Sequence, residues 1–489
     1  MVGTQMEYQS LSKEKDNSSQ FLFVSGDDRI WFVLALLVGI ALRGYFLAQP
    51  MRYDESFTFL NFVNVDIKYL FFYPLPNNHV LHSILTKAST IIWGANPVPI
   101  RLTAFLAGVA LMPLVYNLCR TLGQSGIFAS IAIAVSPYFV LYSTNARGYT
   151  LLVLFTFILA LIGTRIVDQP SILKTYIFSL TAALGMLTMP SMLFPIVGIY
   201  FWVILLLLIN GHDQKNIFYL FAVPSVLITC VLTALFYTPV ILVSNGIESI
   251  IANRFVKAQP WDEFVSQIYP HFIQTFSDFT RDIPSVLLIA TIVLIILGLI
   301  GSVKQRNWPI LLILPSIILT SVLIFLVKQK IPFARTWIYI IPFFILVADS
   351  GFTYITAIVS DRIQSLLKAT ALGISVFLAI SLMSKDAILN YQDTGVFAEA
   401  ETVAKCLKPI MSTNDEIYVK TPADWPLYFY LWYHNVPKNN KTATHESKKK
   451  FAVIKKSGHS SVEMIRKQHI TLLDVGDFTL FQALDIDDH

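Results

Sequence analysis

The amino-acid sequence predicts an α-helical polytopic membrane protein, with about eleven transmembrane helices and a small α/β domain after the last of them. Of the 489 residues, 55% are hydrophobic and 14% are charged, whereas an average soluble protein has roughly 25% charged residues. Apolar runs recur between Ile30 and residue 384, most of them about as long as a bilayer crossing requires. After residue 385, charged residues become frequent and apolar segments become short.

Charge and cysteine content narrow the class of protein further. The net charge of +5 comes from basic residues scattered among loops, without a dense basic patch, so no nucleic-acid partner is expected. Cys119, Cys230 and Cys406 lie far apart and indicate neither a disulfide framework nor a Cys-rich metal site. The first apolar run lacks a small-residue cleavage site, so we expect it to remain as a membrane anchor.

The chain divides into a tail, a membrane domain and a C-terminal domain. Residues 1–28 are polar and are expected to form a cytoplasmic tail. In a membrane domain of residues 29–385, the first helix is predicted from Ile30 to Ala48, and the polar residues 49–97 are expected to form an external loop. The other predicted crossings lie near residues 98–118, 126–143, 149–166, 172–189, 191–209, 217–243, 283–301, 308–327, 333–350 and 366–384.

The short loops predict the orientation in the membrane. A cytoplasmic N-terminus places on the inside a set of basic loop residues: Arg120, Lys174, Lys215, Lys304, Arg306 and Arg362. The larger polar segments then fall outside, namely residues 49–97, 244–282 and everything after about 385. We therefore expect a multi-pass protein of the cell membrane, of the bacterial plasma or inner membrane type, with an active site on the external face.

Residues 386–489 are predicted to form a soluble, extracytoplasmic α/β domain. Val396 to Leu407 has helical spacing, and a hairpin through Gly476-Asp477 is expected. Strands are predicted at Glu416–Lys420, Phe451–Lys455, Thr471–Val475 and Phe478–Ala483. An aromatic cluster is expected either to rest on the membrane interface or to line the site; it consists of Trp425, Tyr428, Phe429, Tyr430, Trp432 and Tyr433.

Two adjacent carboxylates, Asp54 and Glu55, directly follow the first helix. Ionised groups close to hydrocarbon are costly and are often functional. A carboxylate that accepts the proton of a hydroxyl can act as general base in a displacement reaction. The alternative interpretation is that the pair only caps a helix or anchors it at the interface.

Polar side chains return to the same face shortly afterwards, in the segment Asn77-Asn78-His79-Val80-Leu81-His82. The stretch from His79 to Trp93 is predicted to be an amphipathic helix at the membrane surface. His79 and His82 are three residues apart, so they share a helix face. They are expected to contact the donor or the acceptor; metal ligation together with Asp54 or Glu55, and a structural role, are the alternatives.

Several cations lie on the predicted external face against the topological trend: Arg147, Lys328, Lys330 and Arg335. Charges placed in this way indicate an anionic ligand such as a phosphate or diphosphate. Each of them has the alternative interpretation of a side chain that snorkels to the interface. The loop of residues 244–282 is expected to be either a lid or an acceptor-binding element.

These motifs, in this order, resemble those of the membrane-integral glycosyltransferases of the GT-C type. The specific resemblance is to a glycosyltransferase family 39-like group that includes the protein O-mannosyltransferases and the aminoarabinose transferases of lipid A. The matching stretches are Arg52-x-Asp54-Glu55, Pro76 to His82 leading to Pro99-Ile100-Arg101-Leu102, Ser143 to Tyr149, and Pro332 to Arg335 followed by Pro342. The chain departs from the family at Asn145, where many relatives have an acidic residue, and at Asn77-Asn78-His79, where a proline-rich approach is more usual.

The resemblance implies a polyprenyl-phosphate-linked sugar as donor, held in the lipid bilayer, and a protein, lipid or glycan hydroxyl as acceptor. Asp54 would be the general base in an inverting transfer, and Glu55 would orient the acceptor or the sugar. Arg147, Lys330 and Arg335 would hold the phosphate. The other residues expected to bind substrate are Arg52, Asn78, His79, His82, Tyr149 and Lys328. Neither a nucleotide sugar nor an obligatory divalent metal ion is expected.

Two other functions fit parts of the sequence. A transporter or flippase of a lipid-linked or small polar substrate would also place charges and proline-broken helices within the membrane, but no inverted repeat is evident. A non-catalytic scaffold would use the C-terminal domain to bind a partner, and nothing in the first 150 residues favours it.

Overall fold

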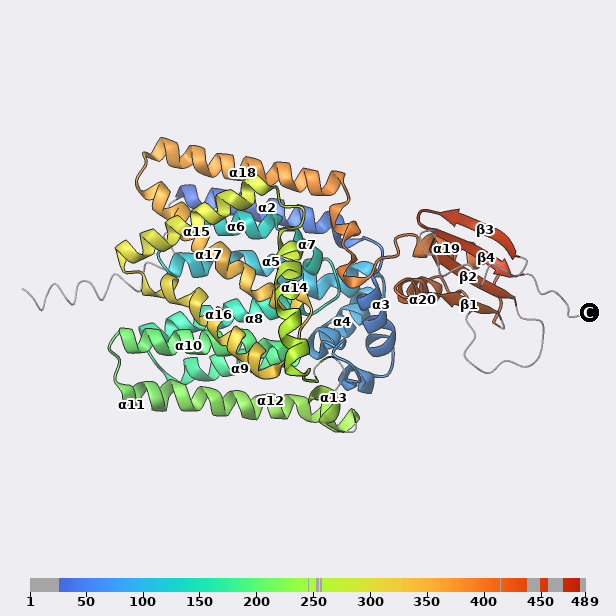
Figure 1. Ribbon diagram of the computed structural model, residues 1–489, viewed down its shortest axis with the longest axis horizontal. Coiled ribbons are helices and arrows are strands. Elements are labelled where there is room, and N and C mark those ends of the chain that lie inside the picture. The colour runs from blue at the N-terminus through green and yellow to red at the C-terminus, as the bar shows by residue number, and fades with distance from the viewer. Residues whose placement is uncertain are drawn as a thin grey trace, which may run out of the picture.

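A computed structural model describes residues 26–244, 246–251, 255, 257–413, 415–437, 449–455 and 469–483. It has two parts, a bundle of roughly parallel long helices and a small α/β domain beyond one end of the bundle (Figure 1). The predicted fold class, an α-helical membrane protein with a small C-terminal α/β domain, is confirmed. Most of the predicted tail lies outside the described residues.

Within the described part of the chain, nine helical segments are long and apolar enough to cross a membrane. Their lengths run from 20 to 30 residues, against about 20 for one crossing. They comprise α2 (Gly26–Leu47), α5 (Pro97–Thr121), α8 (Tyr149–Asp168), η3 with α10 (Pro190–Ile209), α11, η4 and α12 together (Gln214–Val243), α15 (Ser285–Gln305), α16 (Trp308–Lys328), η5 with α17 (Ala334–Ala357) and α18 (Asp361–Ser384).

The other two predicted crossings differ from continuous spans. Helix α9 (Ile172–Thr188) is apolar but has 17 residues. The run at 126–143 is broken into α6 (Ile127–Val135) and α7 (Pro137–Ser143), because Pro137 has no N–H to donate and Ser136 is extended. Arg43 of α2 donates to the carbonyl oxygens of Ile133 and Ala134 beside this break, at 3.0 and 2.8 Å. A buried arginine therefore replaces hydrogen bonds that the broken helix cannot form.

Close packing of α15 against α17 depends on small residues. A side chain at Gly298 would collide with the backbone of Val347, and one at Gly351 with the backbone of Leu294. Without a strong hydrophobic drive between helices in lipid, such small residues let backbones approach closely. Large apolar side chains on the outer surface, among them Leu227, Val231 and Leu235 of α12, are more than half exposed, as lipid-facing positions require.

The polar connections gather at the end of the bundle where α2 ends (Figure 1). The first loop contains α3 (Tyr53–Thr58), η1 (Phe59–Val63), η2 (Ile67–Phe71) and α4 (Val80–Trp93). The later loop contains α13 (Glu248–Ile251) and α14 (Trp261–Thr280), which runs across the bundle helices. A short segment with η6 (Ala387–Asn390) and η7 (Gln392–Thr394) then leads from α18 into the C-terminal domain.

The C-terminal domain contains α19 (Ala400–Leu407), α20 (Asp424–Tyr433) and a four-stranded sheet in the order β1-β2-β4-β3. The strands are β1 (Glu416–Val419), β2 (Lys450–Lys455), β3 (His469–Val475) and β4 (Phe478–Ala483). Strands β3 and β4 form the predicted antiparallel hairpin, in which Val475 pairs with Phe478 across Gly476 at φ 53°. The apolar core of this domain is continuous with Met51, Phe59 and Val63 of the first loop, so the domain rests directly on the segment that carries Asp54.

Candidate active site

Helix α3 turns Asp54 and Glu55 toward the interior at the end of the bundle. It begins immediately after Arg52, whose backbone N–H donates to the Glu55 carboxylate at 2.8 Å. A glutamate that reaches back in this way stabilises the start of a helix. Both carboxylates are buried, with 7% of Asp54 and none of Glu55 exposed. The neighbouring acids nevertheless have very different partners.

Glu55 is fully engaged by other groups of the protein. Arg101 of α5 forms an ion pair with it, and the backbone N–H of Ala146 donates to Oε2 at 2.8 Å. The same arginine also donates to the carbonyl oxygens of Leu47, Gln49 and Pro50 at the end of α2. Glu55 and Arg101 therefore join four segments of the chain. The structure gives Glu55 the surroundings of a structural residue, with each oxygen already accepting two hydrogen bonds.

Asp54 has the opposite surroundings. Its Oδ2 lies 3.3 Å from Nη2 of Arg335, but among the described residues no group donates a hydrogen bond to its carboxylate. Its side chain is 11% exposed. A buried carboxylate with vacant lone pairs is rare because the unmade hydrogen bonds cost free energy, and such an oxygen can accept a proton from an incoming hydroxyl.

Arg335, the second residue of η5 (Ala334–Ile340), is held on several sides. Its Nε donates to the hydroxyl of Tyr149 at 2.8 Å, and its guanidinium stacks over the ring of Phe333 with 4.3 Å to the centroid. Its Nη1 donates to Asp393, to the backbone oxygen at 2.7 Å and to Oδ1 at 3.3 Å. The structure therefore brings the predicted residues Asp54, Tyr149 and Arg335 together, and it adds Asp393, which the sequence analysis did not single out.

Arg147 and His79 form a second part of the site. Arg147 donates to Thr58 Oγ1, to the backbone oxygen of Asn77 and to Asn77 Oδ1, at 2.7–2.8 Å. His79 accepts the backbone N–H of Gly148 at its Nδ1 (2.7 Å), and its Nε2 lies 3.3 Å from Nη2 of Arg147. Burial, with the cations Arg147 and Arg335 nearby, holds the pKa of His79 well below its usual value. His79 is therefore neutral, with its proton on Nε2.

His82 and Asn78 lie deeper. Asn78 is fully buried and donates to the carbonyl oxygens of Leu70 and Phe72, while it accepts from Ser83. His82 contacts Thr86 at 3.3 Å, and burial followed by the charge of Arg147 lowers its pKa to about 3. In the part of the chain that the structure describes, no three His, Cys, Asp or Glu side chains are placed to hold a metal ion.

Arg52 faces away from Asp54, toward the segment that precedes the C-terminal domain. Its guanidinium donates to the carbonyl oxygens of Ile388 and Tyr391 and to Gln49. Burial lowers the pKa of Arg52 to about 10, so it stays charged at neutral pH. Residues 386–395, which we call the strap, are thus tied to the loop that carries Asp54.

The comparisons with known proteins concern the fold of the chain. Residues 78–237 match the family model described as dolichyl-phosphate-mannose-protein mannosyltransferase. The apo structure of ArnT from Cupriavidus metallidurans covers 92% of this chain and 97% of its own, with a TM-score of 0.60 and 13% identity. The same ArnT bound to undecaprenyl phosphate covers 95% and 99%, with a TM-score of 0.58 and 12% identity.

The chain has the GT-C glycosyltransferase fold. The fold that the sequence motifs implied is therefore confirmed. The arabinofuranosyltransferase AftD from Mycobacteria also matches, over 94% of this chain and 40% of its own, with a TM-score of 0.52 and 14% identity. No curated protein matches the sequence at a significant level.

Two predicted cations of this GT-C chain are not brought to Asp54. Lys328, at the end of α16, lies 5.4 Å from the ring centroid of Phe194. Lys330 follows in the next connection, where no hydrogen bond or ion pair joins its ammonium to another described residue. Of the late external loop, Arg335 is the residue that reaches the site.

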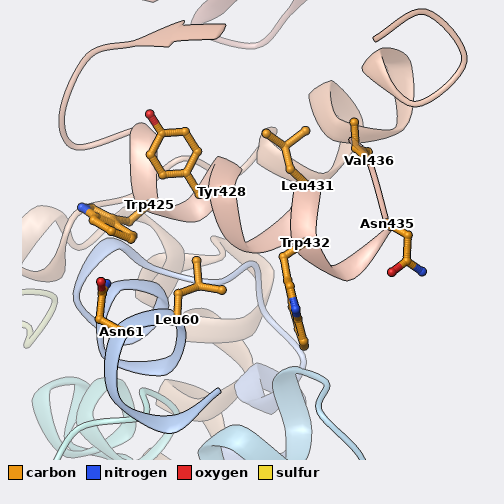
Figure 2. A pocket seen from close by; sticks show the side chains of 8 residues that line it. All are labelled: Leu60, Asn61, Trp425, Tyr428, Leu431, Trp432, Asn435 and Val436. Carbon is orange, nitrogen blue, oxygen red and sulfur yellow. The ribbon is translucent and has the colours of Figure 1, made fainter. Parts of the chain in front are cut away.

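The aromatic cluster of the C-terminal domain lies over the first loop of the GT-C bundle. Phe429 and Tyr430 are buried, and Tyr430 accepts the backbone N–H of Met51 at 3.1 Å. Trp425, Tyr428 and Trp432 instead line a groove of about 450 Å³ between α20 and Leu60 and Asn61 of η1, as Figure 2 shows. The cluster therefore packs the domain onto the loop rather than surrounding Asp54.

Two functional residues were not assigned a role from the sequence. Arg101 had a detectable signal, because it is a cation near the start of a largely apolar helix. Asp393 had none, since it is one of several acidic residues in a polar segment more than 330 positions from Asp54.

Proposed function

We propose that the chain is an integral membrane glycosyltransferase that moves a sugar from a polyprenyl-phosphate donor to an acceptor hydroxyl, with inversion, on the side of the membrane where the C-terminal domain lies. The observation that carries the proposal is the state of Asp54. It is a buried carboxylate that accepts no hydrogen bond from the described residues and lies beside Arg335, in a GT-C fold.

The proposed reaction needs one base and one stabilised leaving group. Asp54 takes the proton of the acceptor hydroxyl, and the hydroxyl oxygen forms the new bond to the anomeric carbon. The bond from that carbon to the phosphate oxygen breaks, and its electron pair stays on the phosphate. Arg335, next to Asp54, neutralises the charge that develops there, so the base and the leaving-group site lie side by side.

Arg147 and His79 are suited to a second contact with the phosphate. One Nη2–H of Arg147 donates to Asn77. Because His79 accepts the Gly148 N–H at Nδ1, its Nε2–H and the second Nη2–H of Arg147 are both donors, on nitrogens 3.3 Å apart. Donors that converge without an acceptor between them are suited to an anionic oxygen. The ligand of ArnT, undecaprenyl phosphate, supports a donor of this class.

The proposed mechanism requires neither a nucleotide sugar nor an obligatory divalent metal ion, because arginine cations stabilise the leaving phosphate. Turnover should therefore persist in excess EDTA at a rate within about twofold of that in buffer. Loss of activity in EDTA, restored by a divalent cation, would contradict this part of the mechanism. The transporter alternative has no specific observation in its favour once the GT-C fold is established.

The test uses the full-length protein in lipid nanodiscs and a panel of undecaprenyl-phosphate sugars. Acceptors come from membranes of a strain that lacks the gene. We expect one donor to release undecaprenyl phosphate while its labelled sugar appears on membrane material. If no donor is turned over, and if the protein in vesicles moves a labelled donor unchanged across the bilayer, the chain is a transporter and the proposal fails.

A further inference from the structure

The strap connects the last membrane helix to the C-terminal domain by way of the active site. Arg52 donates to Ile388 and Tyr391, the backbone N–H of Tyr53 donates to Gly395, and Asn145 donates to Thr394. These contacts place the strap against Arg52 and Tyr53, the two residues that precede Asp54 in sequence, and against the turn that carries Arg147. One strap side chain, that of Asp393, reaches Arg335.

Asp393 is fixed from both sides. Its Oδ1 accepts from Nη1 of Arg335, and its Oδ2 accepts from the hydroxyls of Tyr142 and Tyr138 of α7. Its backbone oxygen takes a second Nη1 hydrogen bond from the same arginine. The Nη1 end of the guanidinium is therefore held by a carboxylate that two tyrosines keep in place.

This arrangement explains why Asp54 stays without hydrogen bonds although a guanidinium lies beside it. Arginine and carboxylate prefer a bidentate pair, with two parallel N–H···O bonds. Arg335 approaches Asp54 with Nη2 alone, at 3.3 Å, because Tyr149 holds Nε and Asp393 holds Nη1. A bidentate pair with Asp54 would need one of those two nitrogens to be free.

We infer that Asp393 is a positioning residue of the active site, which acts by holding Arg335 back from a bidentate pair with Asp54. This inference rests on the proposed function, in which Asp54 is the general base. Such a pair would favour the ionised form of Asp54 and occupy its lone pairs, and both effects make a carboxylate a poorer base. By competing for Arg335, Asp393 leaves the lone pairs of Asp54 open to the acceptor hydroxyl and leaves the free N–H of Nη2 for the donor phosphate.

The first experiment is a double-mutant cycle with Asp393→Asn and Arg335→Lys, measured as turnover of the donor that the panel identifies. Asp393→Asn should lower kcat about tenfold, and the acid limb of its pH–rate profile should move about one pH unit lower. A lysine cannot form the bidentate pair. In the Arg335→Lys background, Asp393→Asn should therefore cost less than about twofold; additive losses would overturn the inference, since they show that Asp393 does not act through Arg335.

Thr394→Val is the matched control in the strap. Thr394 is buried and contacts Arg52 and Asn145, but it does not reach Arg335. We expect this variant to shift the acid limb by less than about 0.2 pH unit, whatever it does to stability. An equal shift in Thr394→Val and Asp393→Asn would mean that disturbing the strap, not removing the charge, causes the effect, and would overturn the inference.

A structure of the Asp393→Asn protein gives a readout that does not need turnover. Without the charge of Asp393, we expect Nη1 of Arg335 to leave the backbone oxygen of residue 393, so that Arg335 approaches Asp54 with two nitrogens within hydrogen-bond distance. An arginine that still presents Nη2 alone would overturn the inference. If Asp393→Asn does not fold, Asp393→Glu replaces it, because this variant keeps the charge but displaces the carboxylate that holds Arg335. A wild-type kcat of Asp393→Glu would also overturn the inference. Should the wild-type protein turn over no donor, the proposed function fails, whereas the structure of the variant still decides whether Asp393 restrains Arg335.

Discussion

Asp54 and Glu55 differ in what surrounds them rather than in chemistry. Glu55 pairs with a buried arginine and accepts two backbone N–H groups, while Asp54 faces one guanidinium at 3.3 Å and accepts no hydrogen bond from the described residues. A buried ion pair is strongly destabilised when one partner is removed, because the other charge is left uncompensated. Substitution of Glu55 should therefore lower the stability of the protein, whereas substitution of Asp54 should lower its activity.

Glu55→Gln should destabilise the protein by roughly 3–5 kcal/mol, since Arg101 would lose its counterion in a fully buried site. The change is expected as a large drop in the temperature at which the detergent-solubilised protein loses its monodisperse peak. Asp54→Asn is the matched control, for which we expect a shift of only a few degrees. Equal stability of Glu55→Gln and the wild type would show that Glu55 is not the structural member of the pair.

The two buried histidines predict a pH dependence of stability. Burial lowers the pKa of His82 to about 3 and that of His79 well below its usual value, whereas in the unfolded chain both have a pKa near 6.5. Below about pH 6.5 the unfolded state therefore binds more protons than the folded state, and stability falls by about 1 kcal/mol per histidine per pH unit.

The measurement is the thermal midpoint of the wild type and of His82→Gln between pH 7.5 and pH 5. The wild-type midpoint should fall as the pH is lowered, and the variant, with one such histidine fewer, should fall about half as steeply. Parallel curves for the two proteins would mean that His82 is not buried in its neutral form.

The broken helix α6–α7 depends on a cation inside the membrane. Arg43 donates to the carbonyl oxygens of Gly39, Ile133 and Ala134 and to the hydroxyl of Ser143. An intramembrane arginine usually suggests a function, but this one replaces the hydrogen bonds that Pro137 prevents. It holds α7, and with it the tyrosines that contact Asp393, against α2.

Arg43→Met should therefore be strongly destabilising, because several buried acceptors would lose their donor at a cost of about 1–3 kcal/mol each. We expect little correctly folded protein by fluorescence-detected size exclusion. Arg362→Met, at an exposed position in the first turn of α18, should express like the wild type. Normal yield and thermal stability of Arg43→Met would show that the carbonyls at the break find other partners.

Most helices and strands could be predicted, because the apolar composition of a segment and the spacing of its apolar residues determine these elements locally. The apolar runs gave the long spans, and the alternation around Gly476-Asp477 gave the hairpin. The break at Pro137 could not be predicted, since membrane helices tolerate proline when neighbours supply hydrogen bonds, and that supply comes from Arg43, about 90 residues away.

Several residues of the site could be predicted from the sequence, but the contacts between distant segments could not. Sequence placed Asp54, Arg147, Tyr149 and Arg335 on one face. It could not show that Arg101 would engage Glu55, or that the strap would return Asp393 to Arg335. Which side chains pair in this way depends on how the helices pack. Neither the spacing nor the residue types of the strap indicate that Asp393 would contact Arg335.

At the scale of the whole molecule, the account requires the first loop and the C-terminal domain to share the external face. Both lie at one end of the bundle, opposite the start of α2 (Figure 1). In a background with the three native cysteines replaced by serine, an impermeant maleimide on intact cells should label Lys68→Cys and Lys408→Cys but not Gln305→Cys. All three positions are exposed. The reverse labelling pattern would place the site on the cytoplasmic face.

The central claim is that Asp54 is the base of a sugar transfer, and Asp54→Asn tests it most directly. The isosteric amide removes the proton acceptor and leaves Arg335 with Tyr149 and Asp393 as partners. We predict that turnover of the undecaprenyl-phosphate sugar falls at least about 10²-fold, with undecaprenyl phosphate binding within about threefold of the wild type. Turnover near the wild-type rate in a folded Asp54→Asn protein would contradict the account.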